Sequence, residues 1–217
     1  MQSGPSAASR RSQLTRTNTE PSILYFPDTA GRAGPLSTSL RDESKKMFQP
    51  TIYPIQTLGG GSLSVMAKPV SGEWIDDEFA GIARLGISHI VSLLEYQEAI
   101  EVGLQNELQL AEQHDMLFTS FPVADRCLPA SVEAFADFTR TLYHGILEGS
   151  HTVVHCRAGI GRAGMTAAGI LLHHGLTTPQ AFELISKQRR VPVPDTPEQY
   201  HWILKHEKQI TGKVELS

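Results

Sequence analysis

The sequence predicts an α/β fold, in which helices flank a central, mainly parallel sheet, with a disordered N-terminal tail before it. Apolar runs of strand length alternate with longer segments of helical periodicity, and further helical segments close the chain. A Ser-, Thr-, Arg-, Gly- and Pro-rich stretch changes to apolar patterning near residue 50. The chain has 217 residues, 40% hydrophobic and 19% charged, which is typical of a globular protein rather than a fibrous or disordered one.

Three segments follow from this composition. Residues 1–50 hold one short apolar stretch, ILYF, and cannot bury enough surface to offset their ordering entropy, which predicts a flexible tail. The Ser/Arg clusters of this tail leave open a second interpretation, a partner-binding or secretion-type address. Residues 51–210 are predicted to form one domain, and residues 211–217 a C-terminal tail.

The first half of the domain is predicted to alternate strands and helices. SLSVMAKP reads as a strand that Pro69 ends, and GEWIDDEFAGIARLG as a helix that closes at Gly86. HIVSLLE is a continuous apolar run, as expected of a strand buried on both faces. The polar segment 95–115 has helical character, and MLFTSFPV is the next strand.

The second half follows the same alternation and then turns helical. Residues 131–149 place apolar side chains at helical spacing before a glycine that ends the helix. HTVVH is a strand, and AGMTAAGILLHHG is an apolar helix whose small residues allow it to lie close to a sheet. Two further helices are predicted in TPQAFELISKQRR and TPEQYHWILKHEKQI. No internal repeat is present.

Charge and cysteine content exclude several classes of protein. A formal net charge of -4 and a pI near 6.1 give no global attraction to nucleic acid or acidic membranes. No apolar run reaches the roughly 18–20 residues that span a bilayer. Two cysteines are too few for a disulfide framework. The double arginine of SRRSQLT resembles the start of an export signal, but polar residues follow it instead of the apolar segment that such a signal needs. We therefore expect a cytoplasmic location.

The stretch VVHCRAGIGRAG, residues 153–164, places a thiol, three glycines and a guanidinium between a predicted strand and a predicted helix. Ligands of open α/β sheets bind at the carboxyl ends of strands, and helix N-termini present unpaired N–H groups to anions. Glycines permit the backbone angles of a loop that turns its N–H groups inward as an anion-binding nest. The predicted phosphate-binding residues are Arg157, Ala158, Gly159, Ile160, Gly161 and Arg162.

Cys156 begins this loop and Arg162 ends it. Inward N–H groups and a helix N-terminus favour the thiolate, which is the nucleophilic form of cysteine. The same N–H groups can hold three phosphoryl oxygens with the sulfur in line, while Arg162 binds two of them as a planar clamp. Catalysis of phosphoryl transfer is mostly positioning and electrostatics, so the loop predicts phosphate-ester chemistry that needs no metal or other cofactor.

VHCRAGIGRAG resembles the signature loop of the cysteine-dependent protein tyrosine phosphatases, in which His-Cys is followed by five residues and Arg. Its glycine pattern is most similar to the dual-specificity branch, which includes the kinase-associated phosphatase. The resemblance covers residues from about 51 to 210 and implies the dual-specificity phosphatase fold and a phosphocysteine intermediate. Cys and Arg at this spacing are weak evidence alone, but strand, His, Cys, glycines, Arg and helix in this order are specific.

Asp125 is the predicted general acid, which a cysteine phosphatase needs to protonate the leaving oxygen. The resemblance places this acid on a separate upstream loop, and FPVADRCLP resembles the family's Pro-x-x-Asp-x-x-x-Pro loop. The alternative is that Asp125 merely begins the turn before the helix at Ser131. Its position after a strand at the same edge of the sheet favours the catalytic interpretation.

Two residues are assigned supporting roles. In the family a glutamine near the C-terminal helix positions the water that hydrolyses the phosphocysteine, and VPVPDTPEQY resembles this region, which implicates Gln199. Thr196 and Gln199 equally match a capping box with Pro197 at the first helical position, and both interpretations stay open. His155 is expected to be half-buried and hydrogen-bonded to the loop backbone, where it supports the thiolate.

Three further residues affect the chemistry that the resemblance implies for this chain. Many family members carry Ser or Thr after the arginine, where the hydroxyl stabilises the departing thiolate, but Ala163 stands here and predicts slow breakdown of the phosphocysteine. Arg157 adds positive charge at the pocket rim, where it either favours substrates with neighbouring acidic groups or faces solvent. Cys127 is expected to be a buried, inert thiol, with a protective disulfide to Cys156 as the alternative.

Together these observations predict a hydrolase that removes phosphate from phosphotyrosine, phosphoserine or phosphothreonine of proteins. Cys156 attacks phosphorus, Arg162 holds the phosphoryl group and Asp125 protonates the leaving group. A phosphorylated protein is the expected partner, without nucleic acid, metal or membrane insertion, and the sequence carries no signal of an oligomeric state. The alternatives are the same chemistry on inositol phosphates or phosphoinositides, a non-catalytic phosphate reader, and arsenate reduction or sulfur transfer, which need no upstream acid.

Overall fold

The computed structural model describes residues 49–212, so the predicted tail 1–50 falls almost wholly outside the described residues, as do residues 213–217. The strands are β1 (Ile52–Leu58), β2 (Gly61–Met66), β3 (His89–Ser92), β4 (Leu117–Ser120) and β5 (His151–His155). The helices are α2 (Ile75–Arg84), α3 (Tyr96–Glu101), α4 (Glu107–Gln113), α5 (Val132–Leu147), α6 (Gly161–His173), α7 (Thr178–Arg189) and α8 (Pro197–Thr211). The predicted alternation of strands and helices is confirmed.

The five strands form one sheet in the order β1-β2-β5-β3-β4, in which β2, β5, β3 and β4 run parallel to one another. Met66 and Ser92 both lie opposite His155, and Ser120 lies opposite Ser92. The carboxyl ends of the four parallel strands therefore meet at one edge of the sheet. The chain segments that follow β5, β3 and β4 all start from this edge, where ligands of open α/β sheets bind.

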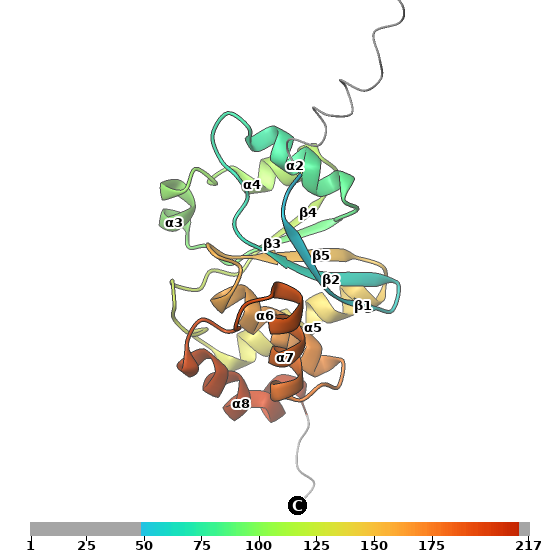
Figure 1. Ribbon diagram of the computed structural model, residues 1–217, viewed down its shortest axis with the longest axis vertical. Helices are drawn as coiled ribbons and strands as arrows, with labels where there is room; N and C mark the ends of the chain where they lie inside the picture. Colours follow the sequence, from blue (N-terminus) through green and yellow to red (C-terminus); the bar gives the residue numbers. More distant parts are fainter. Residues whose placement is uncertain (1–48, 213–217) are drawn as a thin grey trace, which may run out of the picture. The chain divides into compact units, whose positions relative to one another are not determined.

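Helices cover both faces of the sheet (Figure 1). The face covered by α5, α6, α7 and α8 holds the larger apolar core, in which Phe135, Ile170 and Ile203 are buried. On the other face, α2 and α4 pack their apolar side chains, including Phe79, against the sheet. The small residues of α6 allow a close approach to helix α5 rather than to the sheet at Gly169, where a Cβ would lie 2.8 Å from a methyl carbon of Thr139.

Two parts of the fold differ from the expectations. β1 was not predicted, because Pro54 interrupts its pattern; it pairs antiparallel with β2 at the edge of the sheet and is irregular between Pro54 and Gln56. Edge strands tolerate proline because no second neighbour needs its missing N–H. The segment 95–115, expected to be helical throughout, divides into α3 and α4 around Gly103, whose φ of +73° is incompatible with a helix.

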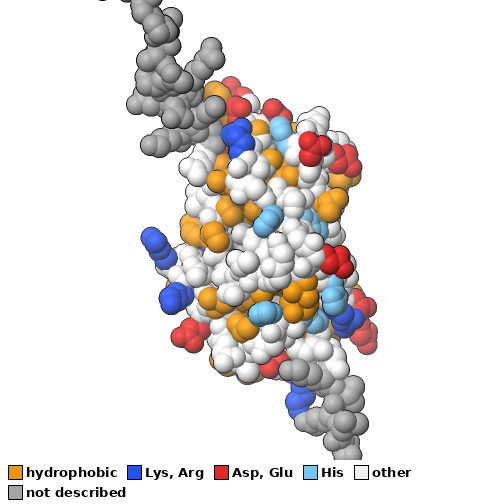
Figure 2. Space-filling view, turned by 90° about the vertical axis from the view of Figure 1, so that its right-hand side faces the viewer, with side chains coloured by type: hydrophobic (Ala, Val, Ile, Leu, Met, Phe, Trp, Pro, Cys, Tyr) orange, Lys and Arg blue, Asp and Glu red, His pale blue; other side chains and the backbone are white. Residues whose placement is uncertain are grey.

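The strands β2, β3 and β4 also end earlier than predicted, at Met66, Ser92 and Ser120. The apolar residues beyond these ends leave the sheet and enter the loops at its carboxyl edge. None of the helices within residues 49–212 combines the length and apolarity needed to cross a membrane. Figure 2 shows the face at the β1–β2 turn, on which acidic, basic, histidine and apolar side chains are interspersed.

Candidate active site

The loop between β5 and α6 begins with Cys156 and ends with Arg162, and it forms the centre of the candidate site. Cys156 directly follows β5 and is 2% exposed, while Arg162 lies in the first turn of α6 and is 3% exposed. In the described part of the chain no side chain caps the N-terminus of α6, whose N-cap residue is Ile160. The first N–H groups of α6 are therefore available to an anion. We call residues 156–162 the phosphate loop.

Gly159 shows why the phosphate loop needs glycine. Its φ is +68°, and a Cβ at this position would clash with the carbonyl oxygen of Met66 at the end of β2. The backbone N–H of Lys68 donates to the carbonyl of Arg157 over 3.2 Å. The loop is thus packed against the exit of the neighbouring strand, and its shape depends on the absence of a side chain at residue 159.

Arg189, at the end of α7, holds the phosphate loop from outside. Its Nε donates to the carbonyl of Gly159 and its Nη2 to that of Ala158, each over 3.0 Å. Since the C=O and N–H of a trans peptide point in opposite directions, carbonyls drawn toward Arg189 turn the following N–H groups away from it. The guanidinium also stacks on Tyr53 of β1, 3.9 Å from the ring centroid. Sequence reasoning missed Arg189, which looked like an ordinary residue at the end of a helix.

Glu98 of α3 binds the guanidinium of Arg162 through both carboxylate oxygens. Nη1 donates to Oε2 over 2.6 Å and Nη2 to Oε1 over 2.8 Å, and Nη1 also donates to the carbonyl of Val123 over 2.9 Å. The hydrogen bonds from Arg162 hold the pKa of Glu98 below its usual range. The side chain of Arg162 is therefore oriented before any substrate binds.

The charges around Arg162 also act on its own pKa. Burial alone would lower it, but the hydrogen bonds to Glu98 and the negative charges of Cys156 and Asp125 raise it above its usual value. The guanidinium is thus secured as a cation beside the thiol. Glu98 was not identified from the sequence, although its position just after the carboxyl end of β3 was an available signal.

Asp125 lies where the resemblance places it, on the segment that follows β4. Its Oδ1 accepts a hydrogen bond from Nη2 of Arg162 over 2.8 Å, and its side chain is 56% exposed. The carboxyl group is therefore next to the group that would hold a phosphoryl oxygen, and it still faces solvent. This contact joins the loop of Asp125 to the phosphate loop and favours the catalytic interpretation over a simple turn residue.

Comparisons with known proteins identify the family of this chain. The model of the Swiss Army Knife DSP-PTPase phosphatase domain, PTP-SAK, matches residues 55–210. The chain belongs to this phosphatase family. A comparison with curated proteins gave no match.

Solved structures share the fold of this phosphatase domain. A kinase-associated phosphatase with its catalytic cysteine changed to serine has a TM-score of 0.69 at 18% identity, over 77% of this chain and 99% of that chain. Tk-PTP in its active form has a TM-score of 0.57 at 22% identity, over 75% and 98%. PTPMT1 in complex with PI(5)P has a TM-score of 0.59 at 17% identity, over 75% and 97%. The predicted dual-specificity phosphatase fold is confirmed.

Gln199 lies between the phosphate loop and the loop that carries Asp125. It is fully buried; its Nε2 donates to the carbonyl of Cys127 over 3.4 Å, and a Cβ built on Gly161 would lie 2.8 Å from its Oε1. The hydroxyl of Thr196 accepts from the N–H of Gln199 over 3.3 Å, which is one half of the predicted capping box. The glutamine side chain points to the loop of Asp125 instead, so its role with water stays a prediction.

The expectation for His155 was wrong in two respects. The residue is fully buried, not half-buried, because it ends a central strand under α4. Neither ring nitrogen is hydrogen-bonded to the loop backbone; Nε2 lies 2.9 Å from Oε1 of Glu107, within ion-pair distance, and Glu107 was not singled out from the sequence. The imidazole of the phosphatase signature therefore contacts a buried carboxylate.

The structure also shows the positions of Arg157, Ala163 and Cys127. Arg157 is exposed, and its charge adds, after the larger effect of Arg162, to the lowering of the pKa of Glu98. Ala163 is fully buried within α6. The expectation that Cys127 is buried was wrong, because it lies on the loop after Asp125 as an exposed free thiol, whereas Cys156 is a buried one. The loop of Cys127 is tied to the segment before α8, because Nε of Arg126 lies 3.4 Å from Oδ2 of Asp195.

Proposed function

We propose that this chain hydrolyses phosphomonoesters of tyrosine, serine or threonine in proteins through a phosphocysteine on Cys156. One observation carries the proposal: the guanidinium of Arg162, buried at the end of the loop that Cys156 begins, is hydrogen-bonded to Asp125. Nucleophile, phosphoryl-binding cation and acid thus belong to one connected site, which a phosphate-binding module would not need.

In the first step, the thiolate of Cys156 forms a bond to phosphorus while the bond from phosphorus to the ester oxygen breaks. Arg162 and the N–H groups of the phosphate loop hold the three equatorial oxygens, whose charge they stabilise. Asp125 gives its proton to the leaving oxygen, so that an alcohol or phenol departs rather than an alkoxide or phenoxide. Phosphate in the loop competes with Asp125 for Nη2 of Arg162, which frees the carboxyl group to face the leaving oxygen.

In the second step, water attacks the phosphocysteine. The carboxylate of Asp125 takes a proton from the water, the new P–O bond forms, and the S–P bond breaks to return the thiolate and release inorganic phosphate. Gln199, between the two loops, is the proposed ligand of this water. Ala163 provides no hydroxyl to stabilise the departing thiolate, so this step is expected to limit turnover.

Hydrolysis of p-nitrophenyl phosphate in the presence of a metal chelator tests the proposal. Wild type should be active, Cys156→Ser should have only background activity, and Asp125→Asn should lose roughly 10²- to 10⁴-fold in kcat. Cys127→Ser and Asp137→Asn are matched controls, since both side chains are exposed and neither contacts Arg162. An inactive wild type, or full activity in Cys156→Ser, would contradict the proposed function.

The main alternative substrates are inositol phosphates and phosphoinositides. The exposed guanidinium of Arg157 in the phosphate loop favours a substrate with a second anionic group. PTPMT1, whose fold this chain shares, has been solved with PI(5)P. A panel of phosphopeptides, soluble inositol phosphates and phosphoinositide vesicles separates the two classes. Protein substrates predict the highest kcat/KM on the phosphopeptides.

A non-catalytic phosphate reader is the second alternative, for which Ala163 is the one indication. Such a protein has no use for a buried thiol beside a cation or for an acid in contact with that cation. Binding of a phosphopeptide without any turnover in the chelated assay would favour the reader.

A further inference from the structure

Behind the nucleophile, three buried polar residues form a row that the proposed mechanism does not use. Ser92 donates from Oγ to Oε2 of Glu107 over 2.8 Å, and Oε1 of Glu107 lies 2.9 Å from Nε2 of His155. Ser92, Glu107 and His155 are 2%, 3% and 0% exposed. His155 directly precedes Cys156, so the row ends at the residue next to the thiol. We call these three residues the Ser-Glu-His row.

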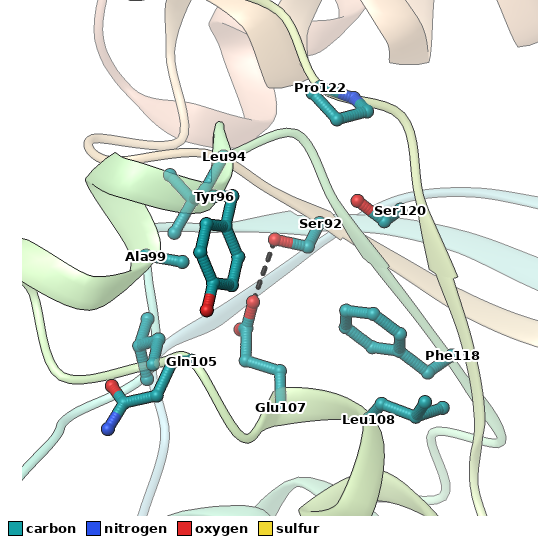
Figure 3. A pocket seen from close by; sticks show the side chains of 11 residues that line it. Ser92, Leu94, Tyr96, Ala99, Gln105, Glu107, Leu108, Phe118, Ser120 and Pro122 are labelled. Atoms are coloured by element: carbon teal, nitrogen blue, oxygen red, sulfur yellow. Dashed lines mark hydrogen bonds between the residues drawn. The ribbon is translucent and has the colours of Figure 1, made fainter.

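The architecture brings the row together from three elements. Ser92 and His155 lie opposite each other at the carboxyl ends of β3 and β5. Glu107 enters from the first turn of α4, and Figure 3 shows its carboxylate reaching up to the hydroxyl of Ser92. Since these positions are set by the sheet and a helix rather than by a mobile loop, the carboxylate has a defined place behind the phosphate loop.

The surroundings of Glu107 make an unpaired charge costly. Its carboxylate borders a cavity of about 160 Å³. Most of the lining side chains are apolar, among them Leu94, Ala99, Leu104, Leu108 and Phe118. A buried carboxylate is tolerated where it is both hydrogen-bonded and paired with a cation. Ser92 supplies the hydrogen bond, and within residues 49–212 the ion-pair partner is His155.

The carboxylate also determines where His155 carries its proton. A carboxylate oxygen 2.9 Å from Nε2 favours a hydrogen on that nitrogen over a lone pair. A second proton, on Nδ1, makes the ring a cation that Glu107 stabilises. A cation next to Cys156 in the chain favours the thiolate.

The other charged groups of the site do not replace Glu107. Glu98 and Asp125 both bond Arg162 and are engaged there. Tyr96 of α3 lines the cavity wall, and Arg157 of the phosphate loop is exposed. The carboxylate in direct contact with the imidazole is that of Glu107.

We propose that Glu107 is a positioning residue of the phosphatase, which holds His155 protonated and through it favours the thiolate of Cys156. This inference rests on the proposed function. Its sign is diagnostic: a carboxylate that acted directly on the thiolate would repel it, so that removing the charge would favour the thiolate. Acting through a protonated imidazole, the same carboxylate has the opposite effect.

The pH dependence of Cys156 alkylation by iodoacetamide tests this, in a Cys127→Ser background so that one thiol reacts. Glu107→Gln should move the midpoint of alkylation about one pH unit higher. At pH values below the wild-type midpoint its kcat/KM should fall about ten-fold, and above the midpoint of the variant it should recover, which a purely structural defect would not do. Glu78→Gln, a control at another buried carboxylate, which accepts from the N–H of Val70, should leave the midpoint unchanged.

Two further measurements cover the case in which Glu107→Gln does not fold. Nitrogen-15 NMR of wild type should show Nε2 of His155 protonated at every pH at which the protein is folded, and an unprotonated Nε2 overturns the proposal. In a His155→Asn background, Glu107→Gln should cause no further shift of the alkylation midpoint, because the mediator is gone. An equal shift in both backgrounds means that Glu107 acts without His155, and overturns it too.

The outcomes also separate this inference from the proposed function, because alkylation requires no turnover. A wild type without phosphatase activity, combined with the expected shift in Glu107→Gln, removes the proposed function and keeps the positioning effect on the thiol. An active wild type whose alkylation midpoint is unchanged or lowered in a folded Glu107→Gln removes the positioning role and keeps the phosphatase.

Discussion

Glu98 holds Arg162 by two parallel hydrogen bonds, of 2.6 and 2.8 Å, in a buried contact between α3 and α6. The planar guanidinium matches the carboxylate, so the pair defines the orientation of the side chain as well as its charge. A phosphoryl group that enters the loop then contacts a cation that is already oriented. The Arg162 side chain loses its conformational entropy during folding rather than during substrate binding.

Glu98→Gln should therefore lower kcat/KM on p-nitrophenyl phosphate about ten- to one hundred-fold. The amide keeps the size of the side chain but provides one acceptor oxygen instead of two, so Arg162 loses its bidentate partner. Glu101→Gln, at an exposed position of the same helix, is the control and should behave as wild type. Equal kinetics in the two variants would show that the orientation of Arg162 does not depend on Glu98.

The same pair makes stability depend on pH. Since hydrogen bonds from Arg162 lower the pKa of Glu98 from its usual 4.5, the charged carboxylate stabilises the folded state above about pH 4.5. This contribution is lost as the pH falls through the lower pKa of the folded state. In urea unfolding, the stability difference between wild type and Glu98→Gln should shrink from pH 6 to pH 3, and a constant difference would contradict this origin.

The candidate residues that the sequence predicted and the structure brings together share one property, which is that their neighbours in the chain reveal them. Cys156 and Arg162 follow an apolar strand and begin a helix, and Asp125 follows another strand. Parallel strands end at a common edge, so these local patterns were enough to place all three side chains in one site.

The residues that were missed act through partners distant in sequence. Glu98 is separated from Arg162 by 64 residues, and Arg189 from Gly159 by 30. On short or polar helices such side chains have the pattern of a solvated face, and a single sequence gives no sign of the partner across the sheet. Glu107 is the same case, because its burial depends on how α4 packs over β3 and β5 rather than on the composition of α4.

Arg189→Leu should weaken phosphate binding, because the carbonyls of Ala158 and Gly159 lose their donor and the loop N–H groups lose their common orientation. We expect the inhibition constant of inorganic phosphate to rise about ten-fold, with a parallel rise in KM. Lys187→Leu removes an exposed positive charge from the same helix and controls for general electrostatics. If both variants weaken phosphate binding equally, charge rather than loop geometry is responsible.

Ala163→Ser should speed hydrolysis of the phosphocysteine, because a hydroxyl next to Arg162 can donate to the departing thiolate. Pre-steady-state hydrolysis of p-nitrophenyl phosphate separates the two steps. Wild type should show a burst of nitrophenol followed by slower turnover, and the variant a smaller burst with a higher steady rate. Ala163→Gly, which also changes the side chain but adds no hydroxyl, is the control, and an unchanged or slower second step in Ala163→Ser would contradict the role given to this position.

His173 gives a second pH dependence of stability, in a pH window that begins above that of Glu98. Burial, with a smaller effect of the charge of Arg140, lowers its pKa from 6.5 to about 4. Between pH 6.5 and 4 the imidazole of His173 binds a proton in the unfolded chain but not in the folded protein, so stability falls as the pH falls through this window. His173→Gln can keep a hydrogen bond to the hydroxyl of Thr139, which lies 3.1 Å from Nε2, but does not titrate.

The melting temperature of the variant should therefore fall less than that of wild type when the pH is lowered from 6.5 to 4. Above pH 7 the two melting temperatures should change with pH at the same rate. His201→Gln, at an exposed position of α8, should follow the wild-type curve. Parallel curves for His173→Gln and wild type would mean that the ring opens to solvent and accepts a proton without unfolding. In that case the packing of α6 against α5 around Thr139 would be looser than the contacts of this side chain indicate.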